Sequence, residues 1–147
     1  MNTPVKQILM QKGSAIITIT PTETVYEAIQ KMVENNVGSL VVTNAKGGLA
    51  GIFVERDCFR KVVLAGKTSK EVLVKDIMTK KVVYATPEMS VDECMAMMTE
   101  KRIRHMPVLD GEKKLIGIIS MGDLVKYVSS EQEAMIKNLE KYIEGSL

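Results

Sequence analysis

The segment GIFVERD, residues 51–57, recurs 66 residues later as GIISMGD, residues 117–123. Outward from this match the two halves of the chain align without a gap over about forty residues, which is typical of an internal repeat. The identical pairs are Thr20/Thr86, Pro21/Pro87, Val25/Val91, Glu27/Glu93, Met32/Met98, Glu34/Glu100, Val42/Val108, Leu49/Leu115, Gly51/Gly117, Ile52/Ile118 and Asp57/Asp123. The chain is therefore a tandem duplication.

Each repeat is predicted to have the element order β-α-β-β-α. Thr24 with Glu27, and Ser90 with Glu93, have the spacing of a helix capping box, and apolar residues follow each pair at helical spacing. Turn-forming residues then separate two apolar segments, which predicts a hairpin. The predicted strands are 16–19, 39–43 and 49–54, then 82–85, 105–109 and 115–120, with further helices that start near Arg56 and Met121 and a short one that ends at Met78.

One such repeat, of about 60 residues, can barely bury its apolar sheet face alone. We therefore expect an α+β (α/β-like) fold in which the two repeats pack sheet to sheet with pseudo-twofold symmetry. The expected domains are 1–66, with an N-terminal helix, and 67–130, with a linker at 67–75; a C-terminal amphipathic helix follows at 131–147. The apolar stripe of that last helix covers either its own module or a second copy, and consists of Ala134, Met135, Leu139, Tyr142 and Ile143.

Composition excludes several classes of function. The net charge is only +2, aromatic residues make up 4% and tryptophan is absent, so nucleic-acid binding has no support. Cys58 and Cys94 lack metal-ligand spacing and are expected to be buried thiols in a reducing compartment. Neither a signal peptide nor a run long enough to span a bilayer is visible. A soluble, cytoplasmic protein without a membrane partner is the expectation.

The sharpest local pattern is Ser120-x-x-Asp123, at the point where a strand ends and a helix begins. One interpretation is a helix N-cap with an acidic residue at the third position. The other is a ligand site, in which Asp123 accepts hydrogen bonds from both hydroxyls of a ribose and Ser120 contacts sugar or phosphate. A carboxylate suits a vicinal diol because it offers two acceptor oxygens and no competing donor. Spacing alone leaves both interpretations open.

Basic side chains lie near this corner in the sequence. Arg104 and His105 have Gly38 and Ser39 as their counterparts, so the fold does not require them, and a guanidinium near a cleft is a suitable phosphate ligand. A lone histidine is more often structural. Arg56 adds charge beside Asp57 in the first repeat, although it also suits a solvated helix face. Since Val54 stands where the second repeat has Ser120, two unequal sites are expected.

These segments resemble a tandem pair of CBS domains, also called a Bateman module. The resemblance rests on GIISMGDLV, GIFVERD, RHMPV and DIMT, covers about residues 3–130, and is closest to small stand-alone CBS-pair proteins. It implies that AMP, ATP or NAD, or the related ligands ADP and S-adenosylmethionine, bind in the clefts between the domains. The nucleotide-binding residues implied are Ser120, Asp123, Arg104, His105, Met106, Pro107, Thr79, Met78, Val83 and Arg56, with a weaker second site at Asp57, Lys12, Gly13 and Ser14.

Three functions are compared. The leading one is a regulatory or sensor module of signal transduction, a homodimer that responds to an adenine nucleotide and acts on an enzyme or transporter not yet identified. An enzyme is disfavoured because we find no Gly-rich phosphate loop, no nucleophile with a base and no metal-spaced cluster in the sequence. The third is a structural dimerisation module whose clefts stay empty.

Overall fold

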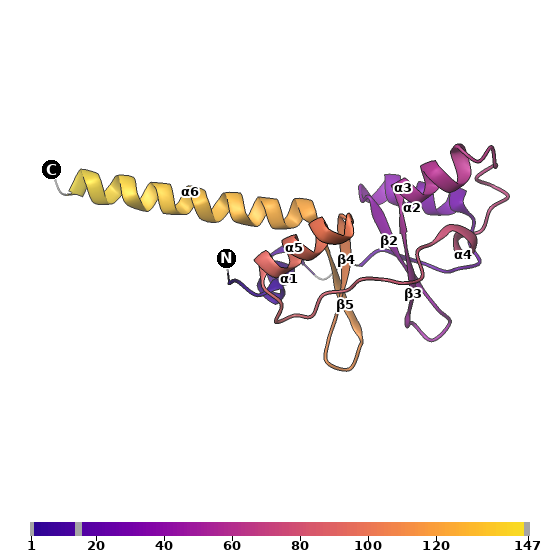
Figure 1. The fold of residues 1–147 in the computed structure, drawn as a ribbon, viewed down its shortest axis with the longest axis horizontal. Helices are drawn as coiled ribbons and strands as arrows, with labels where there is room; N and C mark the ends of the chain where they lie inside the picture. Colours follow the sequence, from indigo (N-terminus) through magenta and orange to yellow (C-terminus); the bar gives the residue numbers. More distant parts are fainter. Residues whose placement is uncertain (1, 14–15, 146–147) are drawn as a thin grey trace.

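The computed structural model describes residues 2–13 and 16–145 (Figure 1). Within the described residues its elements follow the predicted order in both repeats, except for the strand predicted at 82–85. They are α1 (Val5–Lys12), β1 (Thr18–Ile19), α2 (Val25–Asn35), β2 (Ser39–Thr43), β3 (Leu49–Val54), α3 (Glu55–Cys58) with a π-helix (Phe59–Val63), α4 (Val74–Ile77), α5 (Val91–Lys101), β4 (His105–Leu109), β5 (Leu115–Ser120) and α6 (Met121–Gly145). The two predicted hairpins are confirmed with their predicted bounds.

The two hairpins are built alike. Strand β2 pairs antiparallel with β3, and β4 pairs with β5; each pairing shifts register once, at Val42/Thr43 and at Val108/Leu109, which are equivalent positions. Figure 1 shows the hairpins side by side with their turns at the same end. The helix caps are also confirmed: Thr24 Oγ1 accepts from the Glu27 N–H and Ser90 Oγ from the Glu93 N–H, both at 3.1 Å.

The first strand of the second repeat is a correction. In the first repeat β1 pairs in parallel with β2, and the Val41 N–H donates to Ile17 O at 3.2 Å. In the second repeat the strand predicted at 82–85 is, within the described residues, a single bridge between Ala85 and Val108. The residue equivalent to Val41 is Pro107, which has no N–H to donate. The parallel ladder therefore cannot extend past that bridge.

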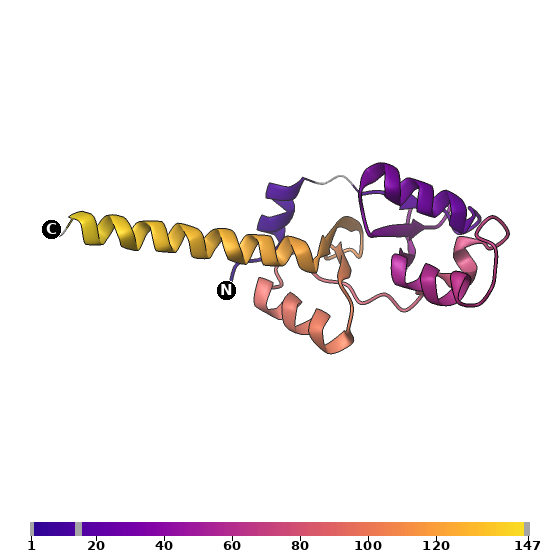
Figure 2. The same ribbon diagram turned by 90° about the horizontal axis from the view of Figure 1, so that it is seen from above.

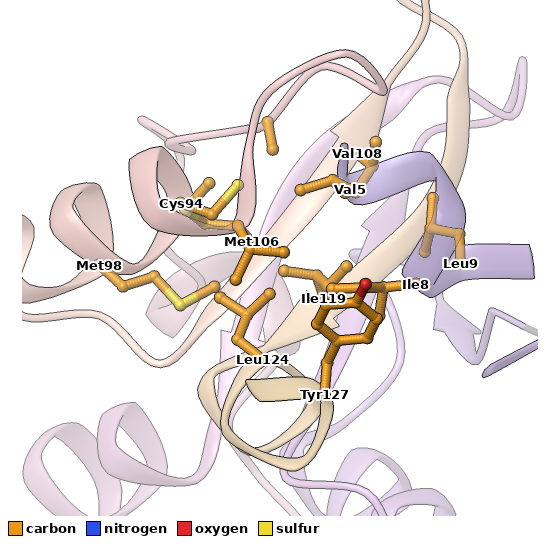
Figure 3. Packing of buried hydrophobic residues seen from close by; sticks show 12 residues of the cluster. Val5, Ile8, Leu9, Cys94, Met98, Met106, Val108, Ile119, Leu124 and Tyr127 are labelled. Atoms are coloured by element: carbon orange, nitrogen blue, oxygen red, sulfur yellow. The ribbon is translucent and has the colours of Figure 1, made fainter. Parts of the chain in front are cut away.

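Each repeat is completed by the segment that precedes the other one. Side chains of α1 lie in the core of the second repeat, against β4, β5 and the start of α6 (Figure 3), and those of α4 lie in the core of the first. Backbone bonds reinforce the exchange, since Val5 N–H donates to Met89 O at 2.8 Å and Val74 N–H to Glu23 O at 2.9 Å. The two repeats therefore form one interlocked unit, in which the N-terminal helix packs on residues of the second repeat.

Both cysteines are buried thiols, as the sequence predicts. Cys58 keeps 4% of its surface exposed in the core of the first repeat, and Cys94 none in the core of the second. Burial raises the pKa of the Cys94 thiol to about 11, which keeps it protonated and unreactive at neutral pH. Both residues are therefore small apolar parts of the cores.

The last helix extends away from the rest of the molecule. Helix α6 begins at the end of β5, packs its first two turns on the second repeat, and then runs straight outward (Figures 1 and 2). Every residue from 129 to 143 is exposed. Of the two expectations for its apolar stripe, cover of its own module is therefore wrong within the described chain.

Candidate functional site

The corner between β5 and α6 is closed by a reciprocal pair of hydrogen bonds. The Asp123 N–H donates to Ser120 Oγ at 3.1 Å, and the Ser120 N–H donates to Asp123 Oδ2 at 2.9 Å. These are the bonds of a capping box, which satisfy two backbone donors at a helix start. The capping interpretation of Ser120-x-x-Asp123 is confirmed. The cap also holds the Asp123 carboxylate at one orientation.

Lys12 is the partner of Asp123, which corrects its predicted place beside Asp57. Its ammonium donates to Asp123 Oδ2 at 2.7 Å and to Ile118 O at 2.9 Å. Lys12 is the last residue of α1, so the packing of α1 on the second repeat brings it to this corner. The Asp123 side chain keeps 24% of its surface exposed. The Lys12 ammonium and the Ser120 N–H both donate to Asp123 Oδ2, and the carboxylate can still be reached from solvent.

The Asp123 carboxylate is ionised at neutral pH. Burial alone would raise the pKa of Asp123, but the hydrogen bonds from Lys12 and from the Ser120 N–H outweigh it and hold the pKa below its usual value. An ionised carboxylate only accepts hydrogen bonds. The group at this corner can therefore bind hydroxyl or cationic donors.

The equivalent corner of the first repeat is more closed. Asp57 is buried; its Oδ2 accepts from Thr79 Oγ1 at 3.0 Å, and its Oδ1 lies 3.7 Å from Lys61 Nζ. Thr79 follows α4 and pairs with Ile52 of β3, so the prediction that it lies beside Asp123 is wrong. Met78 also lies against the first repeat, since a Cβ on Gly51 would lie 2.9 Å from its sulfur. Each carboxylate thus meets the segment that precedes the other repeat.

Arg104 and His105 lie at the Asp123 corner. Arg104 is exposed, and its carbonyl accepts from the Met121 N–H at 2.8 Å. His105 stands opposite Ser120 in the β4–β5 ladder, and a Cβ on Gly38 would lie 3.4 Å from its ring, so it also contacts the first repeat. Burial and the Lys12 charge lower the pKa of His105 against the pull of Asp123 and Glu55, so the ring is neutral at pH 7.

The other residues predicted to bind nucleotide do not form one site with Asp123. Met106 has no exposed surface and lies in the core of the second repeat, so its side chain does not line a cleft, and Pro107 is buried beside it. Arg56 is exposed on α3, the helix that carries Asp57. Gly13 ends α1 with φ 96°. Ser14 lies outside the described residues.

Two cavities have linings that include neither carboxylate. The larger, of 710 Å³, takes in the half-buried Val83; the smaller, of 510 Å³, lies between α2 and α3. The first is lined by Val82, Val83, Tyr84, Met89, Glu93, Ala96, Met97, Glu100 and Lys101. The second is lined by Ile29, Met32, Val33, Asn36, Val37, Gly38, Phe53, Glu55, Cys58 and Phe59. Val83 thus lines a cavity whose lining does not include Asp123.

Glu55 and the Lys12–Asp123 contact are the parts of this site that the sequence did not reveal. Lys12 and Gly13 are 66 residues before Met78 and Thr79, so the two pairs are equivalent, and each was predicted beside the carboxylate of the repeat that follows it. The offset is the same whether a segment packs on the repeat that follows it or on the other one, so it gives no signal for the exchange. Within residues 2–13 and 16–145 no three His, Cys, Asp or Glu side chains are placed to share a metal ion.

Comparison with known proteins agrees with this architecture. The family model described as CBS domain matches residues 5–64 and again 74–130, so the chain belongs to the CBS-domain family, as a tandem pair. Its sequence is 39% identical to the mitochondrial CBS domain-containing protein CBSX3 of Arabidopsis thaliana, over 98% of this chain and 73% of that protein. In the part of the chain that is described, no helix has the length and apolar character to cross a membrane.

Two solved structures are similar over most of the chain. A protein from Burkholderia ambifaria MC40-6, with CBS domains and a name that suggests signal transduction, is 52% identical with a TM-score of 0.84, over 88% of this chain and 96% of its own. The hexameric CBS-CP12 protein of bloom-forming cyanobacteria is 31% identical with a TM-score of 0.75, over 85% and 67% of the two chains. Regulatory CBS pairs, some of them oligomeric, are thus the class to which this fold belongs.

Proposed function

We propose that this CBS pair is a regulatory module that binds an adenosine-containing nucleotide, AMP, ATP or NAD, at the Asp123 corner. The observation that supports it is an ionised carboxylate, 24% exposed, that has the Lys12 ammonium on one oxygen and lies at the corner next to the exposed Arg104. The two ribose hydroxyls can both donate to such a carboxylate. The neighbouring charges of Lys12 and Arg104 suit the phosphates.

Lys12 gives this site a way to affect the rest of the molecule. A bound phosphate is a second anion for the Lys12 ammonium, which otherwise bridges Asp123 Oδ2 and Ile118 O. Because α1 carries Lys12 and packs in the core of the second repeat, a nucleotide that draws Lys12 toward its phosphate changes how the end of α1 is held. The nucleotide shifts the population of such states only as far as its affinities for them differ.

The Asp57 corner is the weaker site of this proposal. Thr79 and Lys61 already contact both carboxylate oxygens, and Val54 supplies no hydroxyl at the position of Ser120. The module acts as a cytoplasmic homodimer without catalytic turnover, and its effect is on a partner enzyme or transporter.

A structural dimerisation module with empty clefts is the second candidate. It is favoured by the Lys12–Asp123 contact itself, because a carboxylate that already has an ammonium 2.7 Å away gains less from a diol. On this alternative the polar corners only cap helices and tie the repeats together.

Ligand titration separates the two candidates. AMP, ATP, NAD and S-adenosylmethionine are titrated calorimetrically and in thermal unfolding, where a ligand at 100 times its dissociation constant adds about 2.7 kcal/mol of stability. Asp123→Asn keeps an acceptor for the Ser120 N–H but removes the charge, so we expect a loss of about a hundredfold in affinity. The matched variant Asp57→Asn retains binding. No response to any nucleotide favours the structural module, and unchanged binding by Asp123→Asn contradicts the site.

Lys12→Met tests the phosphate contact. Methionine keeps the length of the apolar stem and removes the ammonium, so AMP affinity should fall by about tenfold, while binding of adenosine, which has no phosphate, should be unchanged or tighter. Equal losses for the two ligands would show that Lys12 supports the fold of the corner and does not contact phosphate.

A further inference from the structure

The outer part of α6 carries an apolar stripe in heptad spacing. Its positions follow one another at alternating intervals of three and four residues, which is the a/d pattern of paired helices. They are Val125, Val128, Gln132, Met135, Leu139 and Tyr142, with Ile136 and Ile143 beside them. Met135 is 65% exposed, Leu139 56% and Tyr142 77%. Along the helix axis the stripe is about 27 Å long, at about 1.5 Å per residue.

Beyond Val128, which still packs against the core of the second repeat, this stripe is separate from the face by which α6 packs on its own module. Leu124 and Tyr127 point into the core of the second repeat (Figure 3), whereas Val125 is 48% exposed. One and two heptads further along, the position of Leu124 becomes Glu131 and Asn138, and that of Tyr127 becomes Ala134 and Lys141. The helix thus stops presenting large apolar side chains on the core side where the module ends, but continues them on the other side.

A helix with an uncovered apolar stripe needs a packing partner. Short helices are marginally stable in water by themselves, and most of their stability comes from burial of an amphipathic face. The side chains from 129 to 142 are exposed, and Figure 2 shows this part of α6 clear of both repeats. Its persistence as helix is best explained by a partner that buries this face.

The charges on the helix favour a second copy over a membrane surface. Residues 129–143 carry Glu131, Glu133 and Glu140 against Lys137 and Lys141. A helix that lies on anionic lipid has an excess of Lys and Arg on its polar face, which this one lacks. Near-balanced charge allows two copies to approach, and a single polar residue at an a position, here Gln132, is a feature of helix pairs that sets their register.

We propose that α6 pairs with α6 of a second copy of this chain along the Val125–Ile143 stripe. This names the interface of the homodimer in the proposed function and does not depend on the nucleotide. The contact is isologous, since the same face is used by both copies. It continues from the module surface at Val125 to the outer turns of the helix, so the two modules are held at a defined distance.

The first test compares two double variants by sedimentation equilibrium. Met135→Gln/Leu139→Gln places two amides in the stripe, and Glu133→Gln/Glu140→Gln places two amides on the outer face, where no packing is expected. The parent and the outer-face variant should have at least twice the 16.3 kDa mass of one chain. The stripe variant should show a dissociation constant higher by about a hundredfold or more, because apolar side chains of both copies lose their packing. A monomeric parent, or a stripe variant that associates as tightly as the parent, overturns the proposal.

The second test locates the contact directly. Pyrene is attached to Asn138→Cys, which flanks the middle of the stripe, or to Lys137→Cys, which points away from it; the native thiols, 4% and 0% exposed, do not react. Near the middle of the stripe a label meets its counterpart in parallel and in antiparallel pairs, so excimer fluorescence is expected only at 138. Equal or absent excimer signals overturn the pairing. Loss of nucleotide binding with the excimer intact overturns only the nucleotide proposal.

Discussion

Asp57 and Asp123 occupy the same place in the two repeats, yet the chain surrounds them differently. The Asp57 side chain is 11% exposed and meets a threonine hydroxyl and a lysine four residues along its own helix. The Asp123 side chain is 24% exposed and meets a serine cap and a lysine from α1. The duplication therefore keeps the strand-to-helix corner, while one copy buries its carboxylate and the other leaves its carboxylate more exposed. On the proposed function, the pair of repeats needs only one open corner to bind its ligand, and the other corner can stabilise the fold.

The exchange of α1 and α4 between the repeats gives the largest expected effect. Ile8→Ala and Ile77→Ala each remove a side chain that is at most 4% exposed, and each should lower the free energy of unfolding by about 2–5 kcal/mol. Native-state hydrogen exchange should show which strands each variant destabilises. We expect Ile77→Ala to weaken the amides of β2 and β3 first, and Ile8→Ala those of β4 and β5. Loss of protection in the opposite order would contradict the interlocked packing.

Two equivalent glycines, Gly51 and Gly117, allow the packing of the two repeats to be compared, and the expected effects on stability are smaller. A Cβ on Gly51 would lie 2.7 Å from Thr79 O, a backbone atom, whereas one on Gly117 would lie 2.7 Å from the Leu9 side chain, which can turn. Gly51→Ala should therefore cost about 1–3 kcal/mol, and Gly117→Ala less. Urea unfolding of both variants measures the difference, and a larger cost at Gly117 would mean that α1 is held as rigidly as the Thr79 segment.

Val41 and Pro107 are equivalent positions, but only Val41 has a backbone N–H that donates across the parallel strands. Pro107→Val gives the second repeat an N–H that can donate to Val83 O, as the Val41 N–H does to Ile17 O, and should change stability by no more than about 1 kcal/mol. Hydrogen exchange checks this: the amide at residue 107 of the variant should exchange slowly, as the Val41 amide of the parent should. A fast-exchanging amide at 107 would show that something other than proline limits the parallel ladder.

Local patterns in the sequence predicted the local structure well. Both hairpins, both caps and the burial of the cysteines depend on neighbours within a few residues, and each was predicted correctly. The assignments of Lys12, Thr79 and Met78 failed because they depend on which repeat α1 and α4 pack against. Nothing in the spacing distinguishes a segment that packs on its own repeat from one that crosses to the other. The strand at 82–85 failed for a simpler reason, since the proline lies in the strand beside it.

The smallest expected effect is a pH dependence present in one repeat only. His105, the single histidine of the chain, has Ser39 as its counterpart, so His105→Ser converts the second repeat to the first at this position. Burial and the charges of Lys12 and Arg104 lower the pKa of His105, although Asp123 and Glu55 act in the opposite direction. The unfolded chain, with a pKa near the usual 6.5, then binds the proton more readily than the folded one.

The sign of the effect follows from that difference. The parent should lose stability as the pH falls through 6.5, because protonation favours the unfolded chain, and should recover it above that pH. His105→Ser should lack this step, so the free energy of unfolding of the parent minus that of the variant rises between pH 5 and 8. Urea unfolding at half-unit intervals measures this difference. A difference that falls with rising pH would mean that Asp123 and Glu55 outweigh burial and that the ring is charged at the seam, where it would then attract phosphate directly.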